Sequence, residues 1–476
     1  MKSKVEKGVF VLIIMMYASV MIAKHPAEKA PNVLLIMVDD MNDWVGAFGG
    51  HPQAITPHMD ALAEKSVLFS KAYCSAPLCN PSRTSMLTGY LPSTTQVFGN
   101  SEHFRELEGF ENTVTLPQYF HANGYKTAAS GKIFHSPRGP AKVPKPQSDP
   151  GSFEQERRGG LGATYPDQAD RFQHGINFDI LPPSSHLRKS FDWLGVEVPD
   201  EQTQDWQSAE YAAQFLKESH DKPFFLACGI FRPHLPWYAP QQYFDLYDVD
   251  QIELPKILAT DLDDVGSIGS KIAQKELHDE LVRTGNWQAA VSAYLANLSY
   301  ADACVGHLLD ALQASDYLDN TIVVVMGDHG WHLGEKSHWS KNTLWEESAK
   351  TPLLIYDPRQ KGEAAVCERV VSLIDIYPTL VELCGLPTKS DLDGQSIAPL
   401  LKKPNLTWER PALTSKDKKM HSLRSERYRY IVYPDGFEEL YDHEVDPMEW
   451  NNIASDKKNI KVLANFRKEL SAQIKP

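Results

Sequence analysis

The sequence predicts an α/β fold in which helices cover both faces of a large, mostly parallel β-sheet. Three short apolar runs are typical of strands buried on both faces of such a sheet, at residues 32–38, 223–228 and 321–326. Helical patterns of apolar residues lie between them, at 60–65, 288–313 and 373–384. The chain has 476 residues, of which 42% are hydrophobic, so it is long enough for one large domain and a smaller one.

Each apolar run leads into polar residues. The first ends at Asp39 and Asp40, the second is soon followed by His234, and the third runs into Asp328 and His329. Ligands of open α/β sheets bind beyond the carboxyl ends of the strands. We therefore expect the functional site at this edge of the sheet.

The pattern changes near the C-terminus. From about residue 404 it consists of strand-like pieces at 421–433 and 438–441, separated by a turn at 434–436, which predicts a small antiparallel-sheet subdomain. Residues 136–199 are rich in Pro, Gly and Ser and predict a long irregular insertion near the site. We expect three parts: a signal peptide at 1–23, a catalytic domain at 30–403 and a C-terminal subdomain at 404–476.

The N-terminus is typical of a signal peptide. Lys2, Lys4 and Lys7 precede an apolar stretch at 9–23, which is shorter than a membrane span usually needs. We expect export to the periplasm or secretion, without a stable membrane span.

The charge and the cysteine content argue against a nucleic-acid-binding protein and against a disulfide-rich protein. A formal net charge of −14 without dense basic runs argues against nucleic acid as a partner. Six cysteines in a chain of this size do not form a disulfide framework. Cys228, Cys304 and Cys384 have apolar neighbours and are expected to be small buried hydrophobes. Cys79 differs, because Pro81, Ser82 and Arg83 follow it.

The segment after Cys79 predicts an anion site. Pro81 favours the first turn of a helix, so we place Cys79 just before a helix N-terminus, where free backbone N–H groups and Arg83 attract anions such as sulfate. Asp39, Asp40 and Asp328 are hard oxygen ligands that suit Ca²⁺ or Mg²⁺, whereas a thiolate is a soft ligand. An unmodified Cys79 therefore fits this site poorly. The alternative interpretation of Cys79 is a thiol that caps the helix. The alternative interpretation of Asp39 and Asp40 is an acidic turn exposed to solvent.

The motif Cys79-x-Pro-Ser-Arg83 followed by Leu-Thr-Gly resembles the signature of the sulfatase family, in which a maturation enzyme oxidises this cysteine to formylglycine. Further segments also resemble sulfatases, namely residues 38–40, 131–135, 232–236, 327–331 and 393–401. Within the family the chain is similar to iduronate-2-sulfatase and its bacterial polysaccharide-sulfatase relatives, through 116–120, 132–135 and 339–341. The resemblance implies an alkaline-phosphatase-like α/β/α sandwich.

The resemblance also implies roles for single residues. The cation, Ca²⁺ or Mg²⁺, is held by Asp39, Asp40, Asp328, His329 and the modified Cys79. Around the sulfate lie Arg83, Lys132, His135, His234 and Lys341. Of the two hydroxyls of the hydrated aldehyde, one attacks sulfur, and deprotonation of the other expels sulfate. His135 is the base of that second step, and His234 protonates the leaving alcohol.

The resemblance implies hydrolysis of a sulfate ester on a carbohydrate, either a glycosaminoglycan or an algal polysaccharide. A phosphoester or phosphonate hydrolase of the same superfamily and a non-catalytic carbohydrate-binding relative are the alternatives. Further candidates for contact with the sugar are Arg105, Trp331, His332 and His421.

Overall fold

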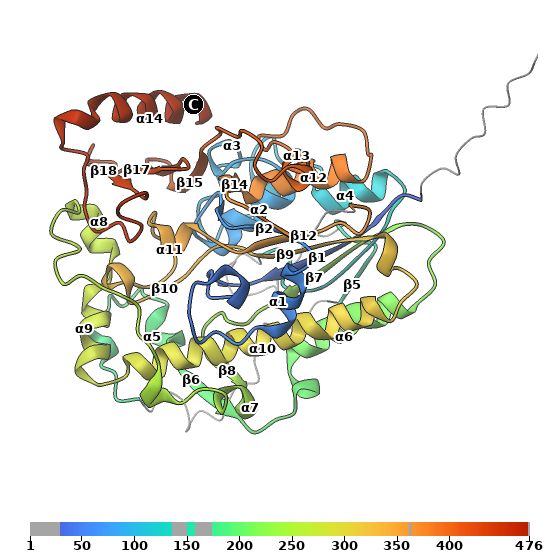
Figure 1. Ribbon diagram of the computed structural model, residues 1–476, viewed down its shortest axis with the longest axis horizontal. Coiled ribbons are helices and arrows are strands. Elements are labelled where there is room, and N and C mark those ends of the chain that lie inside the picture. The colour runs from blue at the N-terminus through green and yellow to red at the C-terminus, as the bar shows by residue number, and fades with distance from the viewer. Residues whose placement is uncertain (1–28, 136–148, 150, 158–173, 361–363, 475–476) are drawn as a thin grey trace, which may run out of the picture.

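The computed structural model describes residues 29–135, 149, 151–157, 174–360 and 364–474. The predicted signal peptide lies outside these residues. An eight-stranded sheet with the order β13-β2-β12-β9-β1-β7-β4-β5 runs through the molecule (Figure 1). Its strands are β1 (Asn32–Val38), β2 (Val67–Phe69), β4 (Lys126–Gly131), β5 (Gln155–Arg157), β7 (Phe224–Ile230), β9 (Thr321–Gly327), β12 (Leu353–Tyr356) and β13 (Ala365–Cys367).

The centre of the sheet is parallel. β1 pairs in parallel with β7 and β9, and β4 pairs in parallel with β7 and β5. β12 runs antiparallel between β9 and β2. The three predicted apolar runs are therefore strands of this sheet, and the prediction of a large, mostly parallel sheet is confirmed.

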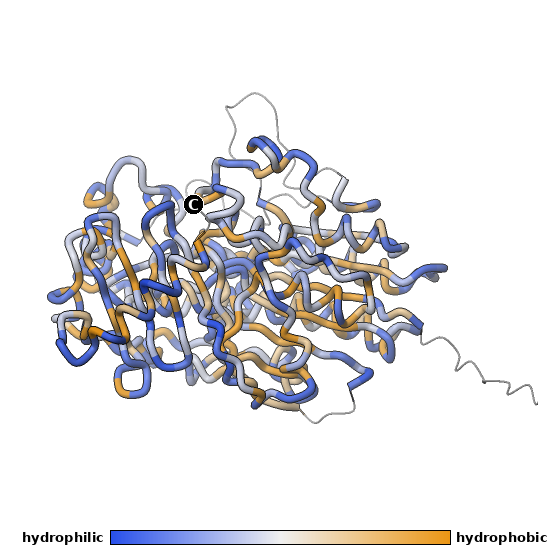
Figure 2. The backbone as a smooth tube through the Cα atoms, turned by 90° about the horizontal axis from the view of Figure 1, so that it is seen from above, coloured by the Kyte–Doolittle hydropathy of each residue, from blue (hydrophilic) through white to orange (hydrophobic). Residues whose placement is uncertain are grey.

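Helices cover both faces of the sheet, as predicted. Side chains alternate along a strand, so Leu34 and Ile36 of β1 pack in one core and Val33 and Leu35 in the other. Burying each such side chain contributes roughly 1.5–3 kcal/mol. One face carries α1 (Pro57–Ala63), α6 (Gln204–Lys217) and α10 (Trp287–Gln313), and the other α2 (Cys79–Thr88), α4 (Leu116–Ala122), α12 (Ile376–Leu383) and α13 (Ala398–Lys402) (Figure 1). Figure 2 shows the hydrophobic segments gathered along the middle of the molecule.

A separate antiparallel sheet lies near the C-terminus. It consists of β15 (Ala412–Asp417), β16 (Met420–Arg424), β17 (Tyr428–Val432) and β18 (Glu438–Asp442), and α14 (Ile460–Gln473) covers one face (Figure 1). The single strand-like piece predicted at 421–433 is in fact two strands. The turn between them is closed by the Ser425 hydroxyl, which accepts a hydrogen bond from the Tyr428 N–H at 3.0 Å.

The prediction that residues 136–199 are irregular is wrong for part of the described segment. β5 adds a parallel strand to the edge of the large sheet, and β6 (Trp193–Val196) pairs in parallel with β8 (Trp237–Pro240). These strands are short and pair with distant residues, so they leave little periodicity in the sequence. The rest of the predicted insertion, including 136–148 and 158–173, lies outside the described residues.

The remaining elements are short. The strands are β3 (Ala72–Tyr73), β10 (His332–Leu333), β11 (Trp339–Ser340) and β14 (Val371–Ser372). The helices are α3 (Pro92–Thr95), α5 (Leu187–Ser190), α7 (Gln241–Phe244), α8 (Ser267–Ile272), α9 (Lys275–Arg283) and α11 (Glu346–Ala349). In the described part of the chain, no helix has the length and apolar character needed to cross a membrane.

Candidate active site

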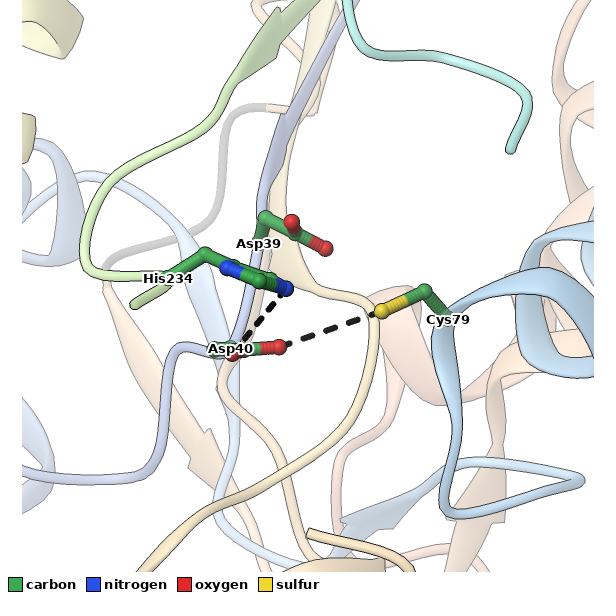
Figure 3. Close-up of side chains that lie close together, drawn as sticks. All are labelled: Asp39, Asp40, Cys79 and His234. Carbon is green, nitrogen blue, oxygen red and sulfur yellow. Dashed lines mark hydrogen bonds and ion pairs between the residues drawn. The ribbon is translucent and has the colours of Figure 1, made fainter. Parts of the chain in front are cut away.

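The carboxyl ends of the parallel strands bring the predicted residues together. Asp39 and Asp40 follow β1, Asp328 follows β9, and His234 comes from the loop after β7. Cys79 is the first residue of α2 and not the residue before it, so its thiol lies at the helix N-terminus. Figure 3 shows Asp39, Asp40, Cys79 and His234 pointing toward one another.

The backbone near Asp40 is held in an unusual conformation. Asp40 has a φ of 61°, in the left-handed region that non-glycine residues seldom adopt. The hydroxyl of Tyr294 in α10 donates a hydrogen bond to the Asp40 carbonyl at 2.9 Å and accepts one from the Asn42 N–H at 2.9 Å. Sequence reasoning missed Tyr294 and Asn42 as positioning residues. Tyr294 lies within an ordinary apolar helix pattern, so no local signal was available to find it.

Arg83 fixes two of the aspartates. Its Nε donates to Asp328 Oδ2 at 2.7 Å, and its Nη2 donates to Asp39 Oδ1 at 3.0 Å. Its Nη1 donates to the backbone carbonyls of Lys132 and Ile133. The whole side chain is buried. In this structure the guanidinium therefore orients the carboxylates, although we expected it beside the sulfate.

Two lysines flank Cys79. Lys132 Nζ forms an ion pair with Asp39, and Lys341 Nζ forms one with Asp40 and lies 3.0 Å from Cys79 Sγ. Burial raises the pKa of the Cys79 thiol, but the two ammonium groups outweigh it and hold the pKa well below its usual value. The pocket around residue 79 is thus built to hold negative charge.

Gly229 at the end of β7 allows the loop that carries Lys132 to approach the sheet. A Cβ at Gly229 would lie 2.1 Å from the carbonyl oxygen of Lys132, which is too close for any side chain. The Lys132 N–H donates to the Gly229 carbonyl at 3.2 Å. This close contact places Lys132 over the carboxylates.

His329 faces the acidic cluster through one ring nitrogen. Its Nε2 lies 3.4 Å from both Cys79 Sγ and Asp40 Oδ1, while its Nδ1 lies 3.0 Å from the Gly330 carbonyl. A proton on Nδ1 that is donated to this carbonyl leaves the Nε2 lone pair free for a cation. Burial lowers the pKa of His329, but Asp328 and Cys79 raise it to about 9.

His135 and His234 border the same pocket. His234 Nε2 lies 3.8 Å from Asp40 Oδ2, and burial together with the Lys341 charge lowers the pKa of His234 to about 3. Burial also lowers the pKa of His135, although a hydrogen bond with Cys79 opposes this. The Nδ1 atom of His135 has no hydrogen-bond partner among the described residues. Both shifts favour the neutral form of the imidazole.

The oxygen atoms of this cluster fit a divalent cation. Two overlapping groups bring one ligand atom from each residue within 4.8 Å of the others: Asp39, Asp40, Cys79 and His234, and Asp39, Cys79, Asp328 and His329. Asp40 Oδ2 is buried without a hydrogen-bond partner among the described residues. Burial and neighbouring carboxylates such as Asp39 raise the pKa of Asp40 to about 8. Crowded carboxylates of this kind are stabilised by Ca²⁺ or Mg²⁺.

Of the further candidates for sugar contact, three are buried and Arg105 is partly exposed. Trp331 and His332 are buried, and His332 bonds to Thr343 and the Glu335 carbonyl. His421 is buried against Ser415, and Arg105 pairs with Asp149. The Trp331 ring lies 5.4 Å from the Lys341 ammonium, and its Nε1 has no hydrogen-bond partner among the described residues.

A cavity of about 590 Å³ lies elsewhere, between the large domain and the C-terminal sheet. Its lining includes Asp43, Glu347, Lys350 and Arg424, and none of the candidate catalytic side chains. We place the active site at the charged cluster, because the perturbed groups converge there.

The fold and the site together are those of a hydrolase of anionic esters, with a cluster of residues that could hold a metal ion. The chain belongs to the sulfatase family, since the family model described as Sulfatase matches residues 31–386. A second model, N-sulphoglucosamine sulphohydrolase, C-terminal, matches residues 334–476.

Curated relatives extend over most of the chain. A sulfatase of Formosa agariphila is 36% identical and covers 90% of this chain and 84% of its own length. Human iduronate 2-sulfatase is 29% identical, and the match covers 92% of this chain and 83% of the relative. An ulvan-active sulfatase of Formosa agariphila is 27% identical, and the match covers 93% of this chain and 80% of the relative.

The solved structure of a phosphonate monoester hydrolase of Agrobacterium radiobacter has the same fold. Its TM-score is 0.73 at 22% identity, with 93% of this chain and 95% of that chain covered. This likeness shows the fold alone. A fold shared with a phosphonate hydrolase does not by itself distinguish a sulfate ester from a phosphonate ester as the substrate.

Proposed function

We propose that this sulfatase removes sulfate from a sulfated oligosaccharide or polysaccharide, with formylglycine made from Cys79 as the nucleophile and Ca²⁺, or alternatively Mg²⁺, as the cofactor. The observation that carries the proposal is the position of Cys79. It begins α2, lies 3.0 Å from the Lys341 ammonium and adjoins three buried aspartates. A hard cation and a soft thiolate are poorly matched, and oxidation to an aldehyde hydrate removes the mismatch.

The side chains divide into two groups in the proposed mechanism. Asp39, Asp40, Asp328 and His329 would hold the cation together with modified residue 79. The cation would lower the pKa of the attacking hydroxyl and offset charge on the sulfuryl oxygens. Lys132 and Lys341 offset the negative charge of the sulfate as it is transferred. Arg83 supports both groups by orienting Asp39 and Asp328.

The two histidines move protons. His135 adjoins residue 79, and its neutral imidazole accepts the proton whose loss releases sulfate and restores the aldehyde. His234 lies on the other side of Asp40 and donates a proton to the leaving alcohol. For this it must first be protonated, which its low pKa disfavours until the negatively charged sulfate ester enters the pocket.

The names of the relatives support a carbohydrate as the leaving group. Iduronate 2-sulfatase and the ulvan-active sulfatase are named for acidic sugars and an algal polysaccharide respectively. A phosphoester or phosphonate hydrolase is the second candidate, because a phosphonate hydrolase shares the fold. A purely carbohydrate-binding relative is disfavoured by the complete set of charged residues around Cys79.

We further propose that residues 1–23 direct export to the periplasm or beyond, and that a formylglycine-generating enzyme is a partner during maturation. Residues 30–403 act as the catalytic domain, and residues 404–476 act as a subdomain that closes one side of the site.

The test is a desulfation screen of the matured protein on defined sulfated oligosaccharides, matched phosphate esters and a small non-sugar sulfate ester. We expect sulfate release from one or more sugars, with formylglycine at position 79 in peptide mass spectra. Cys79→Ser should lose turnover, because a sulfate ester on serine has no second hydroxyl whose deprotonation could expel the sulfate. Preference for the phosphate esters or the non-sugar sulfate, or an active enzyme with an unmodified thiol, would contradict the proposal.

A further inference from the structure

The loop at 231–236 joins β7 to β8 and carries His234. It follows Ile230, the last residue of β7 that pairs with β1. Phe231 and Arg232 are both buried, so their backbone N–H groups need acceptors within the protein. A buried N–H group without an acceptor destabilises the folded state. The start of the loop therefore depends on acceptors from outside the sheet.

Asp205 of α6 supplies both acceptors. Its Oδ1 accepts a hydrogen bond from the Phe231 N–H at 2.8 Å, and its Oδ2 accepts one from the Arg232 N–H at 3.0 Å. Asp205 is only 2% exposed and lies in the first turn of α6. The positive end of the helix dipole favours a carboxylate at that position. One buried side chain of a helix thus fixes two consecutive residues at the start of the loop.

The next two residues of the loop are held through their carbonyl groups. Trp237 Nε1 donates a hydrogen bond to the Pro233 carbonyl at 2.8 Å, and Arg232 Nη1 donates one to the His234 carbonyl at 3.0 Å. These bonds fix the backbone of His234, whereas its side chain is 22% exposed. The position of the imidazole therefore depends on how the loop backbone is held.

Phe231 connects the loop to two side chains of the active site. Its ring centroid lies 4.5 Å from that of His234 and 5.2 Å from Lys132 Nζ. Asp205 holds the backbone of the residue whose ring makes these two contacts. His234 Nε2 lies 3.8 Å from Asp40 Oδ2, and Figure 3 shows the imidazole beside Asp40. A shift of Phe231 would therefore move the imidazole relative to Asp40.

We propose that Asp205 is a positioning residue for His234, because it holds the loop in the place from which the imidazole reaches the oxygen of the leaving alcohol. The inference rests on the proposed function, in which His234 donates a proton to that oxygen. Proton donation needs the two heavy atoms within about 2.6–3.2 Å of each other. A misplacement of about 1 Å can lower the rate by about 100-fold. Asp205 acts through the loop and not on the substrate.

The test is a double-mutant cycle, measured as kcat on one sugar that the wild type desulfates. Asp205→Asn keeps the size of the side chain but turns an amide group toward one of the two backbone N–H groups. It should lower kcat by roughly 10- to 100-fold, with little change in KM, since the proton is needed only in the transition state. His234→Ala should lower kcat by at least about 100-fold. In the His234→Ala background Asp205→Asn should lower kcat by less than about twofold, because the group that it positions is already absent.

Asp302→Asn is the matched control. Asp302 is also buried and accepts hydrogen bonds from two consecutive backbone N–H groups, those of His58 and Met59 of α1, at 3.0 and 2.8 Å. Its substitution should lower Tm as Asp205→Asn does. Any loss of kcat should be the same with and without His234, because a smaller share of folded enzyme affects both backgrounds equally.

Asp205→Ser provides a second cycle if Asp205→Asn does not fold, since its hydroxyl adds no bulk. Normal kcat in the Asp205 variant, or a loss of the same size with and without His234, would overturn the inference alone. Normal kcat in His234→Ala would overturn the role of His234 in the proposed function, and the inference with it. Failure of the wild type to release sulfate from any sugar would overturn the proposed function itself.

Discussion

The direction in which the pKa is shifted distinguishes Cys79 from the other buried cysteines. Burial raises the pKa of Cys74, Cys228 and Cys304, because the thiolate loses its hydration. Cys79 is equally buried, yet the lysines around it reverse the shift. A position that stabilises a buried negative charge also suits the oxygens of a sulfate. The chemistry of the site therefore depends on the charges around residue 79 more than on its burial.

His135 offers the sharpest test at the scale of single residues. We expect His135→Ala to release the alcohol in a single burst and then to turn over at least about 100-fold more slowly, because the base for the second step is missing. Sulfate should remain attached to residue 79, and intact-mass measurement after incubation with substrate detects it. A mutant that turns over normally, or slowly with neither burst nor adduct, would assign the second step to His234.

At the scale of elements, β18 contacts the residue before α11 through the buried carboxyl group of Glu439. The Trp345 Nε1 and the Tyr441 hydroxyl donate hydrogen bonds to Glu439 Oε2 at 2.9 and 2.8 Å. Burial nevertheless raises the pKa of Glu439 from 4.5 to about 7, against these hydrogen bonds. The contact between the C-terminal sheet and the catalytic part of the chain is therefore sensitive to pH.

The sign of this dependence follows from proton uptake. Between about pH 4.5 and 7 the folded state keeps a proton on Glu439 that the unfolded state has lost, so stability falls as pH rises through this window. Glu439→Gln keeps an oxygen acceptor without the charge. We expect the variant to be more stable than wild type by about 1–3 kcal/mol at pH 8 and equally stable at pH 4, as measured by urea unfolding.

Glu444→Gln, at an exposed position of the same subdomain, separates this effect from a general loss of negative charge. If Glu439→Gln destabilises the protein equally at pH 4 and pH 8, the group is held as a carboxylate and its assignment as a protonated residue is wrong.

At the scale of the whole molecule, the site joins segments that are far apart in the sequence. The Asp40 N–H donates to Asp328 Oδ1 at 3.1 Å across 288 residues, and Arg83 connects the start of α2 to the ends of β1 and β9. A cation at this point would link three elements at once. Its binding to the folded state alone would stabilise the entire domain.

Chelation tests this link. EDTA should lower both activity and Tm, because the crowded carboxylates lose the charge that offsets their repulsion, and Ca²⁺ or Mg²⁺ should restore both. Metal analysis of the purified protein identifies the ion. Asp328→Asn should have low activity and a Tm that responds little to EDTA. Full activity and an unchanged Tm after exhaustive chelation would remove the cation from the proposed mechanism.

Some features of the site could not be predicted because they depend on contacts between distant residues. Arg83 donates hydrogen bonds to Asp39, Asp328 and two backbone carbonyls, and its place in the motif does not reveal these partners. Trp331 was a candidate for sugar contact, but it is buried. A side chain's type and neighbours indicate what it can bind, whereas its partners depend on which segments fold beside it.

The sequence by itself determined the central strands and the acidic residues at their ends, and it predicts Cys79 as the reactive position. These features are encoded locally, by unbroken apolar runs that become buried strands and by a short motif. Only the tertiary structure decided that Tyr294 holds Asp40 and that 421–433 forms two strands. The physical reason is that burial and charge pairing arise between residues that are hundreds of positions apart, and no period along the chain records those pairs.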